Sequence, residues 1–202
     1  MIKNIVFDIG KVLIGFDWDS YIKSLFDGET ADKVSRAMFK SGHWPELDRA
    51  VLSLDEILSL FYSVSPDVKP QIDEAFNRIG ECVAKRDWPE DFIRSLKGSG
   101  YNAYYLSNMS EHVMKSNPEA FAFTRLMDGG VYSCHVNLIK PDLQIYRSLL
   151  KKYDLKAEEC LFIDDHEENV VAARQLGMKA IRFDSYEQMK AELAQALSSL
   201  HV

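Results

Sequence analysis

The sequence predicts an α/β fold, a Rossmann-like parallel sheet with a helical bundle inserted near its start. Short apolar runs recur along the chain, and two of them end abruptly in acidic residues, at Asp8 and at Asp164-Asp165. Helical patterns follow the later runs, which is the alternation of parallel strands joined by helices. The long stretch between the first run and the others has helical patterns and no convincing strand.

Five short apolar segments are predicted to be strands of one sheet: residues 4–7, 103–106, 130–133, 161–163 and 180–183. Continuous apolar runs of this length are typical of parallel strands that are buried on both faces. Helices are predicted at residues 143–153 and 167–176, and the second ends at Gly177, as at a C-cap. Residues 184–187 resemble a capping box before a final amphipathic helix. We therefore expect helices on both faces of the sheet.

Residues 16–87 are predicted to form a separate helical cap. Their helical patterns cover residues 19–26, 31–39, 55–64 and 72–84, and Ser53 to Glu56 form a capping box before the third. The core would then consist of residues 1–15 and 88–202. A bundle inserted just after the first strand is expected to cover the carboxyl ends of the strands as a lid.

The composition fits one compact soluble unit of 202 residues, with 47% hydrophobic and 27% charged residues. The net charge is -7 and no block of Lys and Arg stands out, so neither nucleic acid nor an anionic membrane is an expected partner. No apolar run approaches the roughly 20 residues that cross a bilayer. The N-terminus enters a strand directly where a signal sequence would be, so a cytoplasmic protein is expected. The sequence indicates no oligomeric state.

The cysteines Cys82, Cys134 and Cys160 are odd in number and widely spaced among apolar neighbours. They lack the paired spacing of a zinc site and suit a reducing compartment. We expect them to be buried structural thiols.

The acidic pair Asp164-Asp165 predicts a metal site. Adjacent carboxylates repel each other unless a positive charge lies between them. A solvated turn is the alternative, but the pair closes a buried strand, and ligands of parallel sheets bind at that end of the strands. Asp8 ends the first strand in the same way, so we expect these three carboxylates to share one Mg²⁺. The backbone carbonyl of Gly10 offers a further hard oxygen ligand.

Asp8 is also placed to act as a nucleophile that forms an acyl-phosphate, a reaction that needs a metal because both partners are anionic.

Three more polar residues, Ser107, Asn108 and Lys140, stand where the phosphoryl group would be held. Ser107 and Asn108 end a strand before a helix that starts near Ser110, where donors suit a phosphoryl oxygen, although alone they would simply end a strand and cap a helix. Lys140, before Pro141, supplies a compact positive charge, although alone it would be a surface residue.

Taken in order, these motifs resemble those of the haloacid dehalogenase-like hydrolase superfamily, and the resemblance runs the whole length of the chain. It implies that Asp8 is phosphorylated, that Ser107 and Lys140 bind the phosphate, and that the Asp164-Asp165 pair completes a Mg²⁺ site. The place of Asn108 beside Ser107 makes it a further candidate to bind the phosphate. It also implies a phosphatase of small phosphorylated metabolites, with the small helical cap of the subgroup that contains sugar phosphatases.

Gly10 departs from the family's pattern. Most of its phosphatases have a second aspartate there, which protonates the leaving group and then activates water, and such a group contributes about 10²–10⁴ in rate. The local sequence is similar to a branch of glucose-1-phosphate phosphatases, which commonly has asparagine where this chain has Lys11. An anomeric phosphate needs less proton assistance, so the glycine favours a substrate with a good leaving group.

Other residues are candidates to replace the missing acid or to bind the substrate. His166 follows the acidic pair and has a suitable ordinary pKa, although its charged surroundings also fit a solvated side chain. From the cap, Asp17 and the loop of residues 44–49 are placed to reach down toward the substrate at the carboxyl ends of the strands. In that loop we single out Trp44 and also Arg49, which suits a second anionic or hydroxylated part of the substrate.

Other functions remain as alternatives. A metal-free dehalogenase of the same superfamily has no use for Asp164-Asp165 beside the nucleophile. A phosphomutase relies on the acid that Gly10 replaces. A phospho-signalling receiver places its acidic pair after the first strand, whereas here the pair comes last. A catalytically impaired protein that binds a phosphometabolite without turnover is the non-enzyme alternative.

Overall fold

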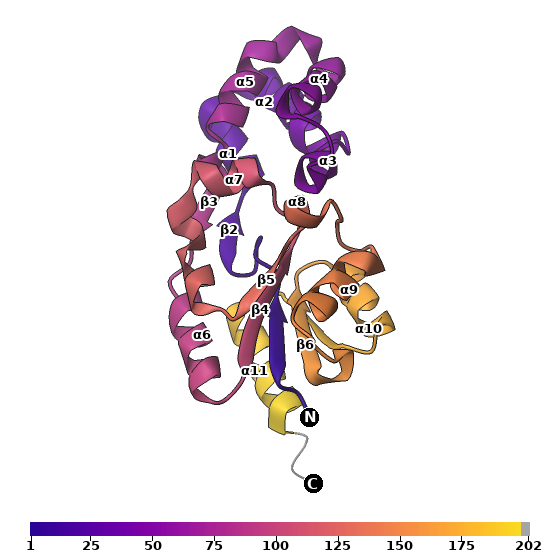
Figure 1. The fold of residues 1–202 in the computed structure, drawn as a ribbon. Helices are drawn as coiled ribbons and strands as arrows, with labels where there is room; N and C mark the ends of the chain where they lie inside the picture. The colour runs from indigo at the N-terminus through magenta and orange to yellow at the C-terminus, as the bar shows by residue number, and fades with distance from the viewer. Residues whose placement is uncertain (199–202) are drawn as a thin grey trace.

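The protein was analysed as a computed structural model, which describes residues 1–198; the predicted core residues 199–202 lie outside this range. Figure 1 shows a sheet-bearing part that contains the N-terminus and a group of helices above it. None of the helices within residues 1–198 combines the length and the apolar character needed to cross a membrane.

The centre of the molecule is a five-stranded parallel sheet with the order β5-β4-β1-β6-β7. Its strands are β1 (Asn4–Phe7), β4 (Asn102–Ser107), β5 (Gly129–Tyr132), β6 (Cys160–Asp164) and β7 (Lys179–Arg182). The predicted segments are all present, with bounds shifted by at most one residue at either end. Phe7 pairs with both Tyr105 and Ile163. The residue after β1 therefore emerges between the ends of β4 and β6.

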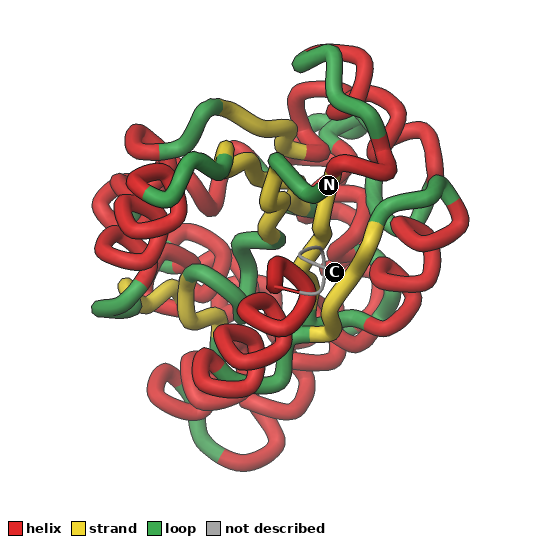
Figure 2. The backbone as a smooth tube through the Cα atoms, turned by 90° about the horizontal axis from the view of Figure 1, so that it is seen from below, coloured by secondary structure: helices red, strands yellow, loops and turns green. Residues whose placement is uncertain are grey.

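Helices cover both faces of the sheet (Figure 2), because successive strand residues point to opposite sides. Ile5 and Phe7 of β1 pack in one apolar cluster, whereas Val6 packs in another. Two helices, α6 (Pro89–Gly98) and α11 (Tyr186–Ser198), belong to the first cluster. The second contains α9 (Leu143–Lys152) and α10 (Glu167–Gln175). Short helices α7 (Glu111–Ser116) and α8 (Ser133–Val136) and the 3₁₀ segments 118–126 and 157–159 complete this part.

The other helices lie beyond the carboxyl ends of the strands (Figure 1). They are α1 (Trp18–Leu25), α2 (Gly28–Ser35), a π-helical turn (Arg36–Lys40), α3 (Trp44–Arg49), α4 (Leu54–Val64), a 3₁₀ turn (Pro66–Val68), α5 (Lys69–Asn77) and a 3₁₀ turn (Ile79–Cys82). Ser53 and Glu56 form the predicted capping box of α4.

Several local predictions were wrong. Within residues 16–87 we expected no strand, but β2 (Ile14–Phe16) pairs antiparallel with β3 (Val83–Lys85). The helix expected to reach residue 84 ends at Asn77, and residues 44–49 form a helix instead of a loop. The last capping box joins Ser185 to Gln188, one residue later than expected. The two strands and α3 are only three to six residues long, so they leave little periodic signal.

The three cysteines are free thiols. Cys82 and Cys160 are buried as expected, whereas Cys134 is half-buried. Burial raises the pKa of each thiol, to about 12 for Cys82 and about 11 for Cys134 and Cys160. Such thiols remain protonated and unreactive at neutral pH.

Candidate active site

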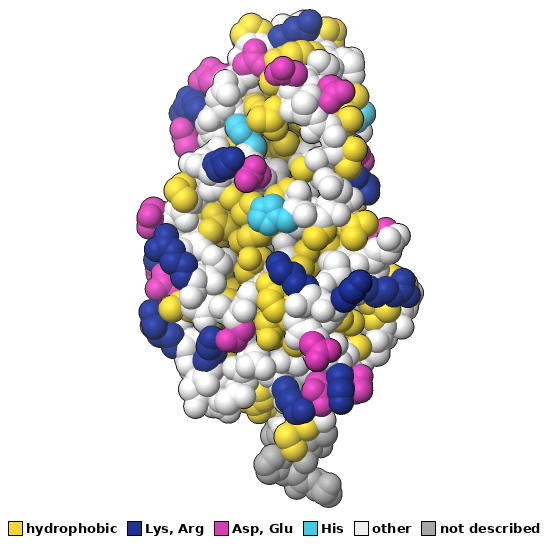
Figure 3. Space-filling model, viewed as in Figure 1, with side chains coloured by type: hydrophobic (Ala, Val, Ile, Leu, Met, Phe, Trp, Pro, Cys, Tyr) yellow, Lys and Arg dark blue, Asp and Glu magenta, His cyan; other side chains and the backbone are white. Residues whose placement is uncertain are grey.

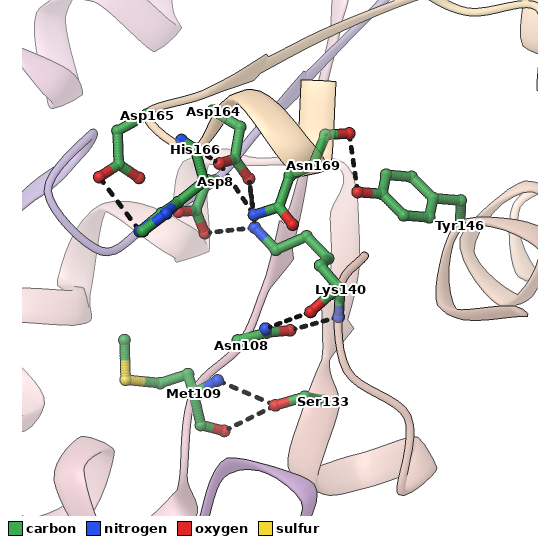
Figure 4. Close-up of polar contacts among 10 residues, drawn as sticks. All are labelled: Asp8, Asn108, Met109, Ser133, Lys140, Tyr146, Asp164, Asp165, His166 and Asn169. Atoms are coloured by element: carbon green, nitrogen blue, oxygen red, sulfur yellow. Dashed lines mark hydrogen bonds and ion pairs between the residues drawn. The ribbon is translucent and has the colours of Figure 1, made fainter. Parts of the chain in front are cut away.

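Three carboxylates meet at the carboxyl end of the sheet. Asp8 follows the central strand β1, Asp164 is the last residue of β6, and Asp165 comes next. Each offers an oxygen, and the three oxygens lie within 4.8 Å of one another. Asp8 is 6% exposed and Asp164 is fully buried. Figure 4 shows their side chains grouped around one point.

Lys140 supplies the positive charge of this cluster. Its Nζ lies 2.9 Å from Asp8 Oδ1 and 2.6 Å from Asp164 Oδ2, and the side chain is buried (Figure 4). Asn108 fixes the Lys140 backbone: its Nδ2 donates to the Lys140 carbonyl at 3.0 Å, and the Lys140 N–H donates to its Oδ1 at 2.8 Å. The loop after β4 and the loop before α9 are thereby held together over the end of β1.

Asn169 orients Asp164 and was not predicted from the sequence. Its Nδ2 donates to both carboxylate oxygens of Asp164, at 3.0 and 3.1 Å, and the His166 N–H donates to Oδ1 at 2.8 Å. The Asn169 carbonyl accepts the Tyr146 hydroxyl at 2.9 Å. The sequence signal that could have identified Asn169 is its position on the first turn of α10, just after the acidic pair.

Burial and mutual repulsion disfavour the ionised carboxylates. Burial raises the pKa of Asp8 to about 6; Lys140 partly offsets this effect, while Asp164 adds to it. Burial likewise raises the pKa of Asp165. Burial opposes the charge of Lys140, but the ion pairs with Asp164 and Asp8 outweigh it and hold the pKa of Lys140 above its usual value. A divalent cation would favour the ionised carboxylates.

The oxygen cluster fits a hard cation such as Mg²⁺, which prefers carboxylate and carbonyl ligands. Asp165 keeps the cluster accessible, since its side chain is 18% exposed. Ser107 gives a second indication of a ligand. It is fully buried at the end of β4, and its Oγ has no hydrogen-bond partner within the described residues. Such an orphan hydroxyl costs about 1–3 kcal/mol unless a ligand satisfies it.

A cavity of about 330 Å³ opens above the carboxylates. Its floor is polar and comes from the sheet-bearing part, including Asp8, Lys140 and Asp165. The opposite wall, which we call the roof, is formed by Phe16, Trp18, Phe39, Trp44, Pro45 and Asp48. Aromatic rings stack within this roof, with centroids 5.2 Å apart for Trp18 and Phe39 and 4.6 Å for Phe39 and Trp44. Hydrophobic side chains also reach the surface between the two parts of the molecule (Figure 3).

The model of the haloacid dehalogenase-like hydrolase family matches residues 2–177. The chain belongs to this family.

The hydrolase is similar to named phosphatases over most of its length. It is 28% identical to a sesquiterpene phosphatase of Aspergillus oryzae over 176 residues, which are 87% of each chain. It is 26% identical to the D-ribitol-5-phosphate phosphatase of Bacteroides thetaiotaomicron, covering 98% of this chain and 100% of the relative. A solved HAD family enzyme of Bacteroides thetaiotaomicron, in complex with magnesium and inorganic phosphate, has a TM-score of 0.69 at 19% identity and covers 94% of this chain and 99% of its own. The last likeness shows the fold.

Among the predicted substrate residues, Trp44 and His166 line the cavity of the hydrolase. Asp17 does not; it is exposed and caps α1, with Oδ1 accepting the Ser20 N–H at 3.0 Å. Arg49 does not line it either and instead pairs with Glu46 at 3.3 Å. The segment 44–49 does reach down, through Trp44 and through a residue that was not singled out, Asp48.

Lys11 also lines the cavity and has a left-handed backbone, with φ 60°. Asparagine is enriched several-fold in this conformation compared with most residues. In this hydrolase the Lys11 carbonyl accepts from Arg86 Nη2 at 2.9 Å, which holds the turn against the end of β3.

Proposed function

We propose that this hydrolase is a Mg²⁺-dependent phosphatase that cleaves small phosphate monoesters through an aspartyl-phosphate on Asp8. The observation that carries the proposal is the meeting of Asp8 with Lys140 and two further carboxylates, Asp164 and Asp165, of which Asp165 lines the same cavity as Asp8 and Lys140. A nucleophile, a fixed cation and a hard oxygen cluster are the parts that phosphoryl transfer to a carboxylate needs.

Each residue then has a defined role. The Asp8 carboxylate attacks phosphorus, while Lys140 offsets the charge of the phosphoryl oxygens and Ser107 donates its free hydroxyl to one of them. The Asn108 side chain is hydrogen-bonded to the Lys140 carbonyl and N–H, so in this proposal it positions Lys140 and does not itself bind the phosphate. The carboxylates of Asp8, Asp164 and Asp165 and the Gly10 carbonyl would hold Mg²⁺. When bound, the ion supplies the positive charge that lets an anionic nucleophile approach an anionic ester.

The acidic pair weighs against a dehalogenase, which would leave the buried Asp164 and the partly exposed Asp165 beside the nucleophile without a role. The relatives named as phosphatases support the same choice.

The substrate's alcohol is the finer part of the proposal. The sequence resemblance favours a sugar phosphate, and an anomeric one would suit Gly10. The roof adds a second candidate, because its aromatic side chains offer apolar surface and Asp48 is its only polar residue. A sugar needs several hydrogen-bond partners, so this geometry favours a phosphate ester of an apolar alcohol. The relative named a sesquiterpene phosphatase fits that candidate.

Phosphate release from p-nitrophenyl phosphate, a primary alkyl phosphate and a panel of sugar phosphates tests the proposal. We expect turnover that requires Mg²⁺ and is lost in Asp8→Asn. Preference for the aryl and alkyl esters would favour the apolar class, and preference for sugar phosphates would favour the other. If the wild type is no faster than Asp8→Asn on the whole panel, the hydrolase binds phosphorylated compounds without turning them over.

A further inference from the structure

Gly10 leaves the proposed phosphatase without the usual proton donor for the leaving oxygen. Six titratable residues line the cavity: Asp8, Lys11, Asp48, Lys140, Asp165 and His166. Three of them form the charged floor that would hold the phosphoryl group and the metal. Lys11 is exposed, and the His166 side chain is 67% exposed and faces Asp165 at 3.5 Å. Asp48 alone approaches from the roof, the side on which the alcohol of a bound ester must lie.

Hydrogen bonds from the sheet-bearing part hold Asp48 over the floor. The Ser133 hydroxyl donates to the Asp48 carbonyl at 2.7 Å and accepts the Met109 N–H at 2.9 Å (Figure 4 shows the latter pair). Asn137 Nδ2 donates to the next two carbonyls, of Arg49 at 3.0 Å and of Ala50 at 3.1 Å. The end of α3, residues 48–50, is thereby held by Ser133 and Asn137, which lie at the two ends of α8.

The Asp48 side chain is also shielded from solvent. It is 8% exposed, and it lies close enough to the backbone N–H of Ser110, the N-cap of α7, for that group to favour its ionised form. The residue lines the same cavity as Asp8 and Lys140.

We propose, on the basis of the function above, that Asp48 is the general acid and base of this hydrolase and takes over the role that the glycine at position 10 vacates. In the first step Asp8 attacks phosphorus, the bond from phosphorus to the alcohol oxygen breaks, and that oxygen takes the proton of the Asp48 carboxyl. In the second step a water oxygen attacks phosphorus, Asp48 takes the water's proton, and the bond to Asp8 breaks. Ester and water become alcohol and phosphate, and both aspartates are restored.

The electrostatic surroundings of Asp48 are compatible with both steps. Burial raises the pKa of Asp48 to about 7; the Ser110 N–H and the charge of Lys140 lower it, and Asp8 raises it further. Cys134, on the neighbouring α8, also interacts electrostatically with Asp48. A proton donor and acceptor works best when its pKa lies near the working pH.

Asp48→Asn, compared on substrates with good and poor leaving groups, tests the proposal. We expect kcat/KM for the alkyl phosphate to fall by about 10²–10³, whereas the value for p-nitrophenyl phosphate falls less than about tenfold, because nitrophenolate leaves without a proton. Glu46→Gln is the matched control: the same kind of change on the same helix, at a residue outside the cavity, should leave the ratio between the substrates unchanged.

A second variant guards against a merely structural effect. Apart from its chain neighbours, the position of a Cβ on Gly10 has no heavy atom nearer than Met109 Cε at 4.0 Å, so Gly10→Asp starts without a clash at its Cβ. Added to Asp48→Asn, it should restore most of the lost alkyl phosphatase activity. Equal losses on both substrates in Asp48→Asn, or no restoration by Gly10→Asp, would overturn the role of Asp48 while the proposed function stands. A wild type inactive on both substrates would refute the proposed function itself.

Discussion

At the scale of single residues, the burial of Asp48 couples its titration to stability. An aspartate whose folded pKa lies above its ordinary value resists ionisation in the fold. Its folded pKa is about 7 against an ordinary 3.8. The resulting penalty is absent below pH 4, grows as the pH rises toward 7 and then levels off, at about 4 kcal/mol at most if each pKa unit contributes roughly 1.4 kcal/mol.

Asp48→Asn should therefore stabilise the protein, and more so at high pH. We expect the urea midpoint of the variant to exceed that of the wild type at pH 8 and the difference to shrink at pH 5, measured with EDTA so that bound metal does not contribute. Glu46→Gln, on the exposed side of α3, controls for the loss of one negative charge from this helix. A stabilisation of the same size at both pH values would contradict the titration argument.

The site residues that could be predicted from the sequence are those whose positions are determined by the ends of strands. Asp8 directly follows β1, and Ser107 and Asp164 end β4 and β6 of the same parallel sheet, so the fold alone brings them to one edge. Asn169 and Asp48 were missed for a different reason. Each lies on a helix whose orientation is decided by tertiary contacts, and a single acidic or amide residue on a helix carries no pattern of its own.

At the scale of elements, α3 is a short helix with a strained end. Ala50, its C-cap, lies in the left-handed region with φ 54° and ψ 36°. A residue with a Cβ costs roughly 1 kcal/mol there, whereas glycine adopts the conformation freely.

Ala50→Gly should raise the free energy of unfolding by about 0.5–1 kcal/mol, because the strain is relieved and the carbonyl that Asn137 contacts is retained. Urea unfolding measures this change. Ala31→Gly is the contrasting control, because Ala31 lies inside α2, where glycine costs about 1 kcal/mol. Destabilisation by both variants would mean that the left-handed turn contributes no strain.

The link from Asn137 to α3 predicts an effect on catalysis at a distance. Asn137 itself has φ 57°, so Asn137→Gly removes both hydrogen bonds to α3 without adding backbone strain. We expect hydrolysis of the alkyl phosphate to fall several-fold more than hydrolysis of p-nitrophenyl phosphate, in the direction of Asp48→Asn but to a smaller extent. The ratio of the two kcat/KM values is the measurement. An unchanged ratio would show that Ser133 alone suffices to position Asp48.

The elements that the sequence missed depend on neighbours more than on local pattern. β2 and β3 have three residues each, and they pair across the whole helical segment, where Gly15 faces Ala84 so closely that an added Cβ would lie 3.1 Å from the alanine Cβ. The five strands of the main sheet were predictable because continuous apolar runs are required of strands covered on both faces. Short elements at the junction of the two parts have no such requirement.

At the scale of the whole molecule, the acidic cluster should make the stability of the fold depend on metal. The buried carboxylates of Asp8 and Asp164 share the charge of one lysine, and Asp165 adds a third negative group. A cation bound by these groups in the folded chain, and not in the unfolded one, stabilises the fold by mass action.

Mg²⁺ should therefore raise the melting temperature of the wild type and raise it much less in Asp165→Asn. At a hundredfold excess over Kd the gain is about 2.7 kcal/mol, which corresponds to about 5–10 °C for a chain of this length. Asp19→Asn, on the exposed face of α1 and away from the cluster, should keep the full shift. Thermal unfolding requires no substrate, so it tests the metal site apart from catalysis. If Mg²⁺ shifts the wild type and Asp165→Asn equally, Asp165 does not help to hold the ion.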